Sequence, residues 1–557
     1  MGTTDPAAGL GPALHDLASR LDRVRFELPT PAQAGDRAAR AEVLWSIREY
    51  LLPRLADWEA PILAVVVGST GSGKSTIVNS LAGRSVSAAG VLRPTTTAPV
   101  VWCHKDNADR YRQRFVGSYG ASDERPLMVS ASDDPMLHHL SVVDAPDFDS
   151  VVGRHREMAE ELLAAADVAV FVASAQRYAD AVPWEFLERL KRRDLTTVLV
   201  LNRVTSRSES VLGDYTRLLT DAGLLGPVVV IDEQTIDPVT GTLPSSAVAP
   251  IRARLEALGE RSGRDAALAQ AIAGTTDQVA AAALDIADRV EQEQTIGNRL
   301  IEAAAAPYQV EVDRLAVSLA EGTLIRGEVL ARWEEFVGTG ELTRALASGA
   351  NRFRDWARRV FGGRPVVAQL GAEAGSELVA TVTRRADAAS RSAAAAWETD
   401  ATGRALLSEV PEGALWRHDP QTENEARNAV ADWMGDVVRL VREEGQGKKK
   451  QAQAASYGVN AAAVVLLLTV FVHTAGITGA ELGIAAGAAA AQQKILEHVF
   501  GKVAARALVE EARRRLARAV GKVIESDGLR FATVVTDRTD GDTTAAEIRH
   551  GVAGVVG

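Results

Sequence analysis

The sequence predicts an α/β domain with a doubly wound, mainly parallel sheet, followed by a long α-helical domain that includes a hydrophobic helical hairpin. Up to about residue 256, short apolar β-branched runs alternate with helical stretches, which is typical of a doubly wound sheet. Beyond about residue 265, Ala-rich segments with apolar residues three and four positions apart predict helices. Residues 451–493 contain no Lys or Arg and only one acid, Glu481.

Composition excludes some classes of function. A chain of 557 residues is expected to form about two to four domains. The net charge of −11 argues against broad nucleic-acid binding, so no nucleic-acid partner is expected. The single cysteine, Cys103, cannot form an intramolecular disulfide, which fits a reducing cytosol, and it is expected in or near the core. Residues 1–12 lack a basic region followed by an apolar stretch, so no secretory signal is expected.

The elements follow from local patterns. Residues 1–58 are predicted to form N-terminal helices, at 8–27 and 37–58, that could pack on the later helical stalk. Strands are expected at 62–67, 99–102, 140–143, 168–173, 197–201 and 228–231, because each is a short apolar run. Helices between them are expected at 76–82, 156–165 and 183–192. These elements place the α/β domain at 59–256. The remainder is predicted as a helical stalk at 265–450, the hydrophobic hairpin at 451–493, an amphipathic helix at 494–530 and a polar tail at 531–557, which is expected to be frayed from residue 535.

A phosphate-binding loop follows the first predicted strand. The sequence from Gly68 to Ser75 fits G-x-x-x-x-G-K-[ST], and such a loop wraps its backbone amides around phosphates while the next helix presents its N-terminus to them. Lys74 would reach the β- and γ-phosphates, and Ser75 would supply a Mg²⁺ ligand. The alternative is a glycine turn with an unrelated lysine. The predicted nucleotide-binding residues here are Gly68, Ser69, Thr70, Gly71, Ser72, Gly73, Lys74, Ser75 and Thr76.

Two further segments suit a Mg²⁺ site. Asp144 ends a predicted strand and would hold the ion through water, although an Asp at a strand end is often only a turn former. Between this strand and the phosphate loop lies a threonine-rich segment, in which Thr96 or Thr97 could close on Mg²⁺ and the γ-phosphate. The pattern does not show which of the two threonines would contact the ion. The alternative is that this segment is a polar loop with no role in nucleotide binding.

These residues give the chain a resemblance to the translation-factor-like GTPases and, within them, to the bacterial dynamin-like proteins. The resemblance is found in residues 68–83, 94–97, 144–147 and 200–203. It implies GTP as substrate and Mg²⁺ as cofactor, with guanine contacts from Asn202, Arg203, Ser246 and Ala247. In the family motif Lys stands at the position of Arg203 and Asp at that of Thr205. The guanine-binding carboxylate is therefore missing from its usual place, and the alternative carboxylates are those of Asp232 and Glu233, after the next strand.

The catalytic groups are less completely specified by the resemblance. Asp147 stands where the family usually has Gly, and Phe148 stands where a water-positioning Gln could be. Dynamin-like proteins place catalytic groups in the phosphate loop, at the positions of Ser69 and Thr70. The catalytic candidates are therefore Lys74, Thr70, Thr96 and Thr97, with Thr97 also a metal-ligand candidate beside Ser75 and Asp144. A second molecule across the nucleotide face could order this region, which implies self-association.

The apolar stretch predicts membrane contact. Residues 458–475 are long enough to cross a bilayer as a helix, and residues 477–491 could return. Lysines flank both sides, so the positive-inside rule places both ends on the cytoplasmic side of the cell membrane. A lipid membrane is therefore an expected partner. The alternative is a buried hairpin within a soluble helical domain.

The favoured hypothesis is a dynamin-like GTPase that hydrolyses GTP with Mg²⁺ to drive conformational change or self-assembly at the membrane. A soluble Era-like GTPase of ribosome assembly is an alternative, but it predicts a basic RNA-binding appendage that the sequence does not show. An ABC-type ATPase would need a Leu-Ser-Gly-Gly-Gln-like signature, which is absent. A scaffold that binds nucleotide without turnover is the remaining alternative.

Overall fold

The computed structural model describes residues 7–87, 98–116, 127–147, 153–205, 209–224, 226–237, 240–321, 365–444, 501–539 and 543–557. The chain divides into two compact units. The first comprises Met1–Arg25, Ala34–Glu291 and Gly541–Gly557, and the second comprises Phe26–Gln33 and Gln292–Asp540. Helix α10, Arg261–Glu321, contributes residues to both units.

The first unit contains a seven-stranded sheet in the order β3-β2-β4-β1-β5-β6-β7. The only antiparallel pair among these described strands is β2 with β4, so the sheet is mainly parallel, as predicted. The edge strand β3 was not predicted, because its sequence MVSAS is half polar and partly exposed instead of a continuous apolar run. The strands are β1 (Ile62–Gly68), β2 (Val100–His104), β3 (Met128–Ser132), β4 (Leu140–Asp144), β5 (Val168–Ser174), β6 (Thr196–Val204) and β7 (Val228–Asp232).

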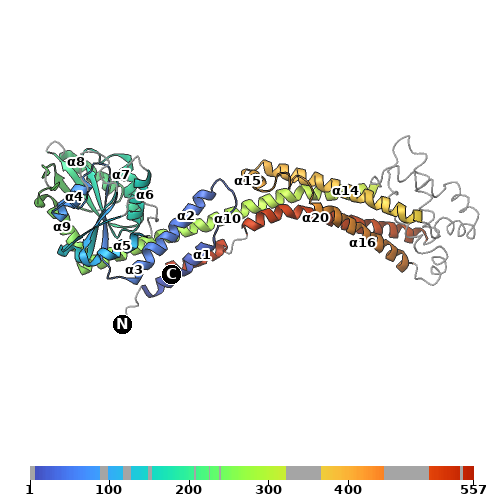
Figure 1. Ribbon diagram of the computed structural model, residues 1–557, viewed down its shortest axis with the longest axis horizontal. Coiled ribbons are helices and arrows are strands. Elements are labelled where there is room, and N and C mark those ends of the chain that lie inside the picture. The colour runs from blue at the N-terminus through green and yellow to red at the C-terminus, as the bar shows by residue number, and fades with distance from the viewer. Residues whose placement is uncertain are drawn as a thin grey trace, which may run out of the picture. The chain divides into compact units, whose positions relative to one another are not determined.

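Helices surround this sheet (Figure 1). Strands β1 and β5 are buried along their whole length, which explains their continuous apolar sequences. One face of the sheet packs on α4, α9 and the beginning of α10, through Ile77, Val248 and Ala267 among others. Cys103 is buried, as predicted. The helices of this α/β part are α4 (Lys74–Ala82), α5 (Ala108–Val116), α6 (Gly153–Ala164), α7 (Ala181–Arg192), α8 (Glu209–Asp221) and α9 (Ser245–Gly259).

N-terminal helices are attached to the sheet through a buried polar cluster. They are α1 (Ala7–Arg23), α2 (Gln33–Trp45), the π-helical segment η1 (Ser46–Leu51) and α3 (Leu52–Ala56). Asp167, just before β5, is fully buried and accepts a hydrogen bond from the Tyr50 hydroxyl at 3.1 Å. It also accepts from the Leu63 amide at 2.7 Å and forms an ion pair with Arg54. The carboxylate therefore has several partners, which offset the cost of its burial.

The predicted frayed tail is instead helical, which corrects the sequence-based expectation for 531–557. Helix α20 (Lys502–Thr539) continues past residue 530, and α21 (Ala545–Val556) follows it. Thr544 and Glu547 form a capping box at the start of α21, and Ile548 and Val552 bury one face of it. Helix α21 packs against α1, and Arg20 donates to the Glu547 carbonyl at 3.2 Å. Tertiary packing therefore stabilises a segment whose polar content suggested fraying.

The described part of the second unit is mainly helical, as predicted. Its helices, besides the later part of α10, include α14 (Pro365–Glu398), α15 (Ala401–Glu409), α16 (Pro420–Glu444) and α20. In Figure 1, α14, α16 and α20 lie side by side, and each pair of them is in contact. Two tryptophans anchor the core: the Trp397 indole donates to the Leu300 carbonyl at 2.9 Å, and the Trp433 indole donates to the Ala512 carbonyl at 2.8 Å.

The predicted membrane hairpin, residues 451–493, lies outside the described residues. Among the helices that the structure does describe, none combines the length and apolar character needed to span a bilayer.

Candidate nucleotide site

The phosphate loop joins β1 to α4, at the edge where the carboxyl ends of parallel strands meet. Strand β1 lies between β4 and β5, so Gly68 is beside Val172 of β5 and Val66 is beside Asp144 of β4. Strand β6 follows β5, and Asn202 stands opposite Ser174. The topology therefore brings the predicted loop, the predicted metal ligand and the predicted base-binding motif to one edge of the sheet.

Two glycines of the loop are required by its geometry. At Gly73, φ is +100°, a conformation that residues with a Cβ rarely adopt, and an added Cβ would lie 2.3 Å from the Asn202 amide nitrogen. At Gly68, an added Cβ would lie 2.3 Å from the Val172 backbone oxygen. The loop thus packs closely on β5 and β6, and its curvature depends on the absence of side chains at these two positions.

Lys74 lies across the loop. Its ammonium donates to the Gly68 carbonyl at 2.8 Å and to the Ser69 carbonyl at 3.3 Å. It also forms an ion pair with Asp147, and the lysine side chain is only 5% exposed. The cation is therefore held at the loop, where phosphate oxygens of a nucleotide would need it.

Asp144, the predicted metal ligand, fits that role. It is fully buried, and its Oδ2 accepts from the Ser87 hydroxyl at 2.6 Å, while its Oδ1 has no hydrogen-bond partner among the described residues. Burial raises the pKa of Asp144, against the opposing effect of the Ser75 and Ser87 hydroxyls and the Lys74 ammonium. A buried carboxylate oxygen without a partner, next to the Ser75 hydroxyl, suits the oxygen-rich shell of Mg²⁺. Thr96 and Thr97 lie outside the described residues.

Asn202 links the base-binding motif to the phosphate loop. Its amide nitrogen donates to the Ser72 carbonyl at 2.8 Å, and its Oδ1 accepts from the Arg203 amide at 2.9 Å. Arg203 adopts a left-handed conformation with φ of 61°. Both ends of the Asn202 side chain are thus engaged, which fixes the carboxyl end of β6 against the loop.

The remaining residues predicted to contact guanine lie at the carboxyl end of β7 and in the first turn of α9. Ser246 and Ala247 are in the first turn of α9, with Ser246 exposed and Ala247 packed against the core of the sheet. Asp232 and Glu233 are exposed, and the Glu233 amide donates to the Val204 carbonyl at 2.8 Å. The backbone at Glu233 is therefore next to the end of β6, and a role of either carboxylate in base recognition stays a prediction.

Arg177 is a site residue that the sequence analysis missed. Its guanidinium donates to the Thr70 carbonyl at 3.3 Å and to the Asp180 carboxylate at 2.7 Å. Arg177 lies beyond the end of β5, in no recognised motif, and only the adjacency of β5 and β1 places it near the loop. Its guanidinium, paired with Asp180, therefore lies against the backbone of the phosphate loop.

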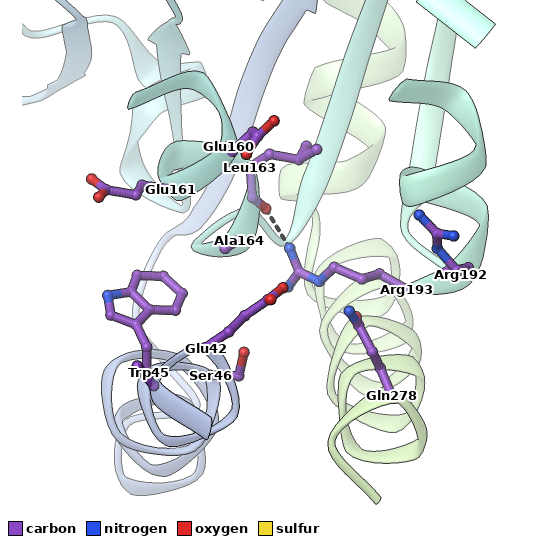
Figure 2. A pocket seen from close by; sticks show the side chains of 11 residues that line it. Glu42, Trp45, Ser46, Glu160, Glu161, Leu163, Ala164, Arg192, Arg193 and Gln278 are labelled. Atoms are coloured by element: carbon purple, nitrogen blue, oxygen red, sulfur yellow. Dashed lines mark hydrogen bonds between the residues drawn. The ribbon is translucent and has the colours of Figure 1, made fainter. Parts of the chain in front are cut away.

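A separate cavity, of about 640 Å³, lies between α2, the ends of α6 and α7, and α10 (Figure 2). Trp45, Glu160 and Gln278 are among its lining residues, and Arg193 reaches across to donate to the Leu163 carbonyl. None of the predicted site residues lines it. Since α6 ends just before β5 begins, this cavity belongs to the amino-terminal edge of the strands and not to the phosphate loop.

Comparison with known proteins agrees with this geometry. Residues 63–203 match the family described as 50S ribosome-binding GTPase. A probable transmembrane GTPase, FZO-like and chloroplastic, from Arabidopsis thaliana is 30% identical over 157 residues, which is 28% of this chain but only 16% of that relative. Both matches are to GTPases, so the predicted resemblance of the α/β part to GTPases is confirmed.

Two solved structures are similar over nearly the whole chain, at low identity. One is a member of an oligomerised bacterial dynamin pair, at 13% identity and a TM-score of 0.39, covering 100% of this chain and 95% of that one. The other is LeoA, a bacterial dynamin GTPase from ETEC, at 10% identity and a TM-score of 0.24, covering 99% of both chains.

Proposed function

We propose that this chain binds GTP with Mg²⁺ and hydrolyses it to GDP and phosphate. The observation that carries the proposal is the placement of Lys74, buried in a glycine-bounded loop that also faces the Asp144 carboxylate and the Asn202 amide. The match of residues 63–203 to a GTPase family supports GTP over ATP. Asn202 is the part of the base-binding motif that the chain retains.

Each residue has a role in this proposal. Backbone amides of residues 69–75 and the Lys74 ammonium bind the β- and γ-phosphates, while Ser75 and Asp144 hold Mg²⁺, with Thr97 as a further ligand. Held by these residues, Mg²⁺ would supply positive charge that stabilises the negative charge developing on the phosphates during hydrolysis. Thr70, with Thr96 or Thr97, orients the attacking water. Arg177, whose guanidinium contacts the Thr70 carbonyl, adds positive charge beside the loop.

We further propose that nucleotide turnover drives conformational change or self-assembly at the cytoplasmic face of a membrane. Two observations support this step: residues 451–493 contain no Lys or Arg, and the FZO-like relative is named a transmembrane GTPase. By this proposal the hairpin enters the bilayer and returns, and the helical unit responds to the nucleotide.

A role in ribosome assembly is a second candidate, because the matching family is described as ribosome-binding. That match covers only the α/β part of the chain, and the net charge of −11 is unfavourable for an RNA partner.

Hydrolysis of GTP and of ATP, each with and without liposomes of anionic lipid, tests the proposal. The expected result is Mg²⁺-dependent GTP turnover that exceeds ATP turnover and increases with liposomes, and that Lys74→Ala abolishes. Undiminished hydrolysis by Lys74→Ala would refute the site. Cosedimentation with liposomes and with ribosomal subunits separates the two cellular roles, because deletion of 458–491 should abolish only the former. A wild-type chain that never sediments with liposomes would overturn the membrane step.

A further inference from the structure

A second group of metal-ligating side chains lies at the end of β2. His104, Asp106 and His138 each offer a ligand atom, and these three atoms all lie within 4.8 Å of one another. Strand β2 runs antiparallel to β4, with Val100 opposite Asp144, so the last residue of β2 is at the other edge of the sheet from the nucleotide site. The group is therefore separate from the Mg²⁺ ligands described above.

Three short elements position these side chains. His104 is the last residue of β2 and is 4% exposed, while Asp106 lies in the 3-10 helix η2 (Lys105–Asn107) that follows directly. His138 ends the 3-10 helix η3 (Pro135–His138), just before β4. The imidazole rings of His104 and His138 are 4.0 Å apart between centroids and tilted by 33°. Two imidazoles and a carboxylate thus converge from segments more than thirty residues apart in sequence.

The spacing suits a tetrahedral ion. Two ligands bound about 2.0–2.1 Å from one Zn²⁺ ion lie roughly 3.4 Å apart. His104 Nδ1 and Asp106 Oδ2 are already 3.2 Å apart. His138 is exposed, so a rotation of its side chain can bring a ring nitrogen to the same distance. Lys105, the cation between the two ligands in sequence, is paired with Asp133 at 2.7 Å.

A purely structural role explains only part of the arrangement. His104 Nδ1 accepts from the Asp106 amide at 3.4 Å and so caps η2. This contact is long for a hydrogen bond and uses a residue type that is not among the usual capping residues. Capping also requires neither the Asp106 carboxylate nor the second imidazole stacked on His104.

We propose that His104, Asp106 and His138 bind one divalent transition-metal ion, Zn²⁺ or an ion of similar chemistry, with water completing the shell. Imidazole ligands favour such ions, whereas Mg²⁺ and Ca²⁺ favour shells made of oxygen alone. The ion fastens η2 to η3, and so holds the far end of β2 to the segment that leads into β4. Its expected effect is on the stability of the α/β part, and nucleotide binding at the opposite edge does not depend on it.

Direct metal binding by the full chain tests the inference. The protein, produced without a histidine tag and stripped with EDTA, is titrated with ZnCl₂ by calorimetry and then scanned for its thermal midpoint with and without the ion. His138→Gln and Asp106→Asn are the test variants, since both side chains are exposed and neither should impair folding. His139→Gln is the matched control, because His139 is the adjacent exposed histidine and lies outside the group.

The wild-type chain and the control are expected to bind one zinc ion and to show a raised thermal midpoint. Each test variant should bind at least about 100-fold more weakly, because outer-shell changes alone cost about 10–100-fold in metal affinity. All four proteins should bind GTP equally. Wild-type zinc binding no tighter than that of His138→Gln would overturn the site, as would an equal loss in His139→Gln.

Discussion

Lys74 and Asp147 form an ion pair at the mouth of the phosphate loop, with the lysine 5% and the aspartate 17% exposed. Asp147 lies three residues beyond the metal-ligand candidate Asp144, in the segment that follows β4. Phosphate oxygens of a nucleotide need the same ammonium, so the carboxylate and the nucleotide compete for it. Nucleotide binding in the loop is therefore expected to release Asp147, and with it the segment that follows β4, from Lys74.

Asp147→Asn is expected to raise the affinity for GTP by about tenfold, equivalent to ~1.4 kcal/mol. The substitution removes a negative charge next to the bound phosphates and frees the Lys74 ammonium. The measurement is the Kd of a fluorescent GTP analogue at low and moderate salt. Asp180→Asn, which removes the carboxylate paired with Arg177, is the control for loss of a nearby charge. Unchanged or weaker binding by Asp147→Asn would show that the pair does not oppose the nucleotide.

Asp144→Asn is expected to increase the Mg²⁺ concentration needed for GTP binding and to remove part of its pH dependence. Burial raises the pKa of Asp144, so its protonation competes with Mg²⁺ at a higher pH than for an ordinary aspartate of pKa about 3.9. The affinity of the wild-type chain for Mg²⁺ should therefore decrease as the pH is lowered toward this raised pKa, because the protonated carboxyl group no longer binds the ion. Mg²⁺ titrations between about pH 5 and 8 measure the effect. Equal pH dependence in wild type and Asp144→Asn would contradict the assignment.

Gly73→Ala is expected to abolish nucleotide binding. A side chain there is strained at φ of +100° and would lie 2.3 Å from the Asn202 amide nitrogen, so the loop must shift away from β6. Gly83→Ala is the matched control, since it has φ of +63° but nothing within 4 Å of the added Cβ. The Gly83→Ala substitution should lower the free energy of unfolding by about 1 kcal/mol, and this variant should still bind GTP. Equilibrium binding and urea unfolding of both variants distinguish loop geometry from simple backbone strain.

The phosphate loop could be predicted from sequence because all its chemistry lies within a few consecutive residues, from Gly68 to Ser75. The strands β1 and β5 were equally clear, because burial on both faces requires continuous apolar sequence. By contrast, the contact of Arg177 with Thr70 depends on strand order, which the sequence does not state. Helix α21 was mistaken for a tail because its stability comes from packing on α1. Sequence patterns thus located local chemistry well and long-range packing poorly.

Cys103 is expected to resist alkylation in the folded chain. Burial raises the pKa of its thiol to about 11, compared with about 8.5 for an exposed cysteine. Iodoacetamide at about pH 8 should therefore modify it slowly in buffer and rapidly in urea. The raised pKa also means that folding stability falls as pH rises from the ordinary thiol value to about 11, because the unfolded chain loses the proton first. Equal alkylation rates in buffer and urea would show that Cys103 is accessible.

Asp527→Ala is expected to destabilise the helical unit by about 3 kcal/mol. Asp527 is 3% exposed and accepts from the Asp419 amide at 2.6 Å, the Thr422 hydroxyl at 2.7 Å and the Tyr308 hydroxyl at 2.8 Å. It also pairs with Arg530 at 3.0 Å. Removal of the carboxylate leaves these donors, a guanidinium among them, without their shared acceptor.

Urea unfolding, followed by tryptophan fluorescence, measures this loss, because Trp397 and Trp433 report on the same helical core. Asp537→Ala is the control, since Asp537 is an exposed residue of the same helix and its removal should change stability by less than about 0.5 kcal/mol. Asp527→Asn keeps the shape and one acceptor oxygen, so its cost should fall between the two. If Asp527→Ala were no more costly than Asp537→Ala, the shared carboxylate could not be what joins α10, α16 and α20 in this unit.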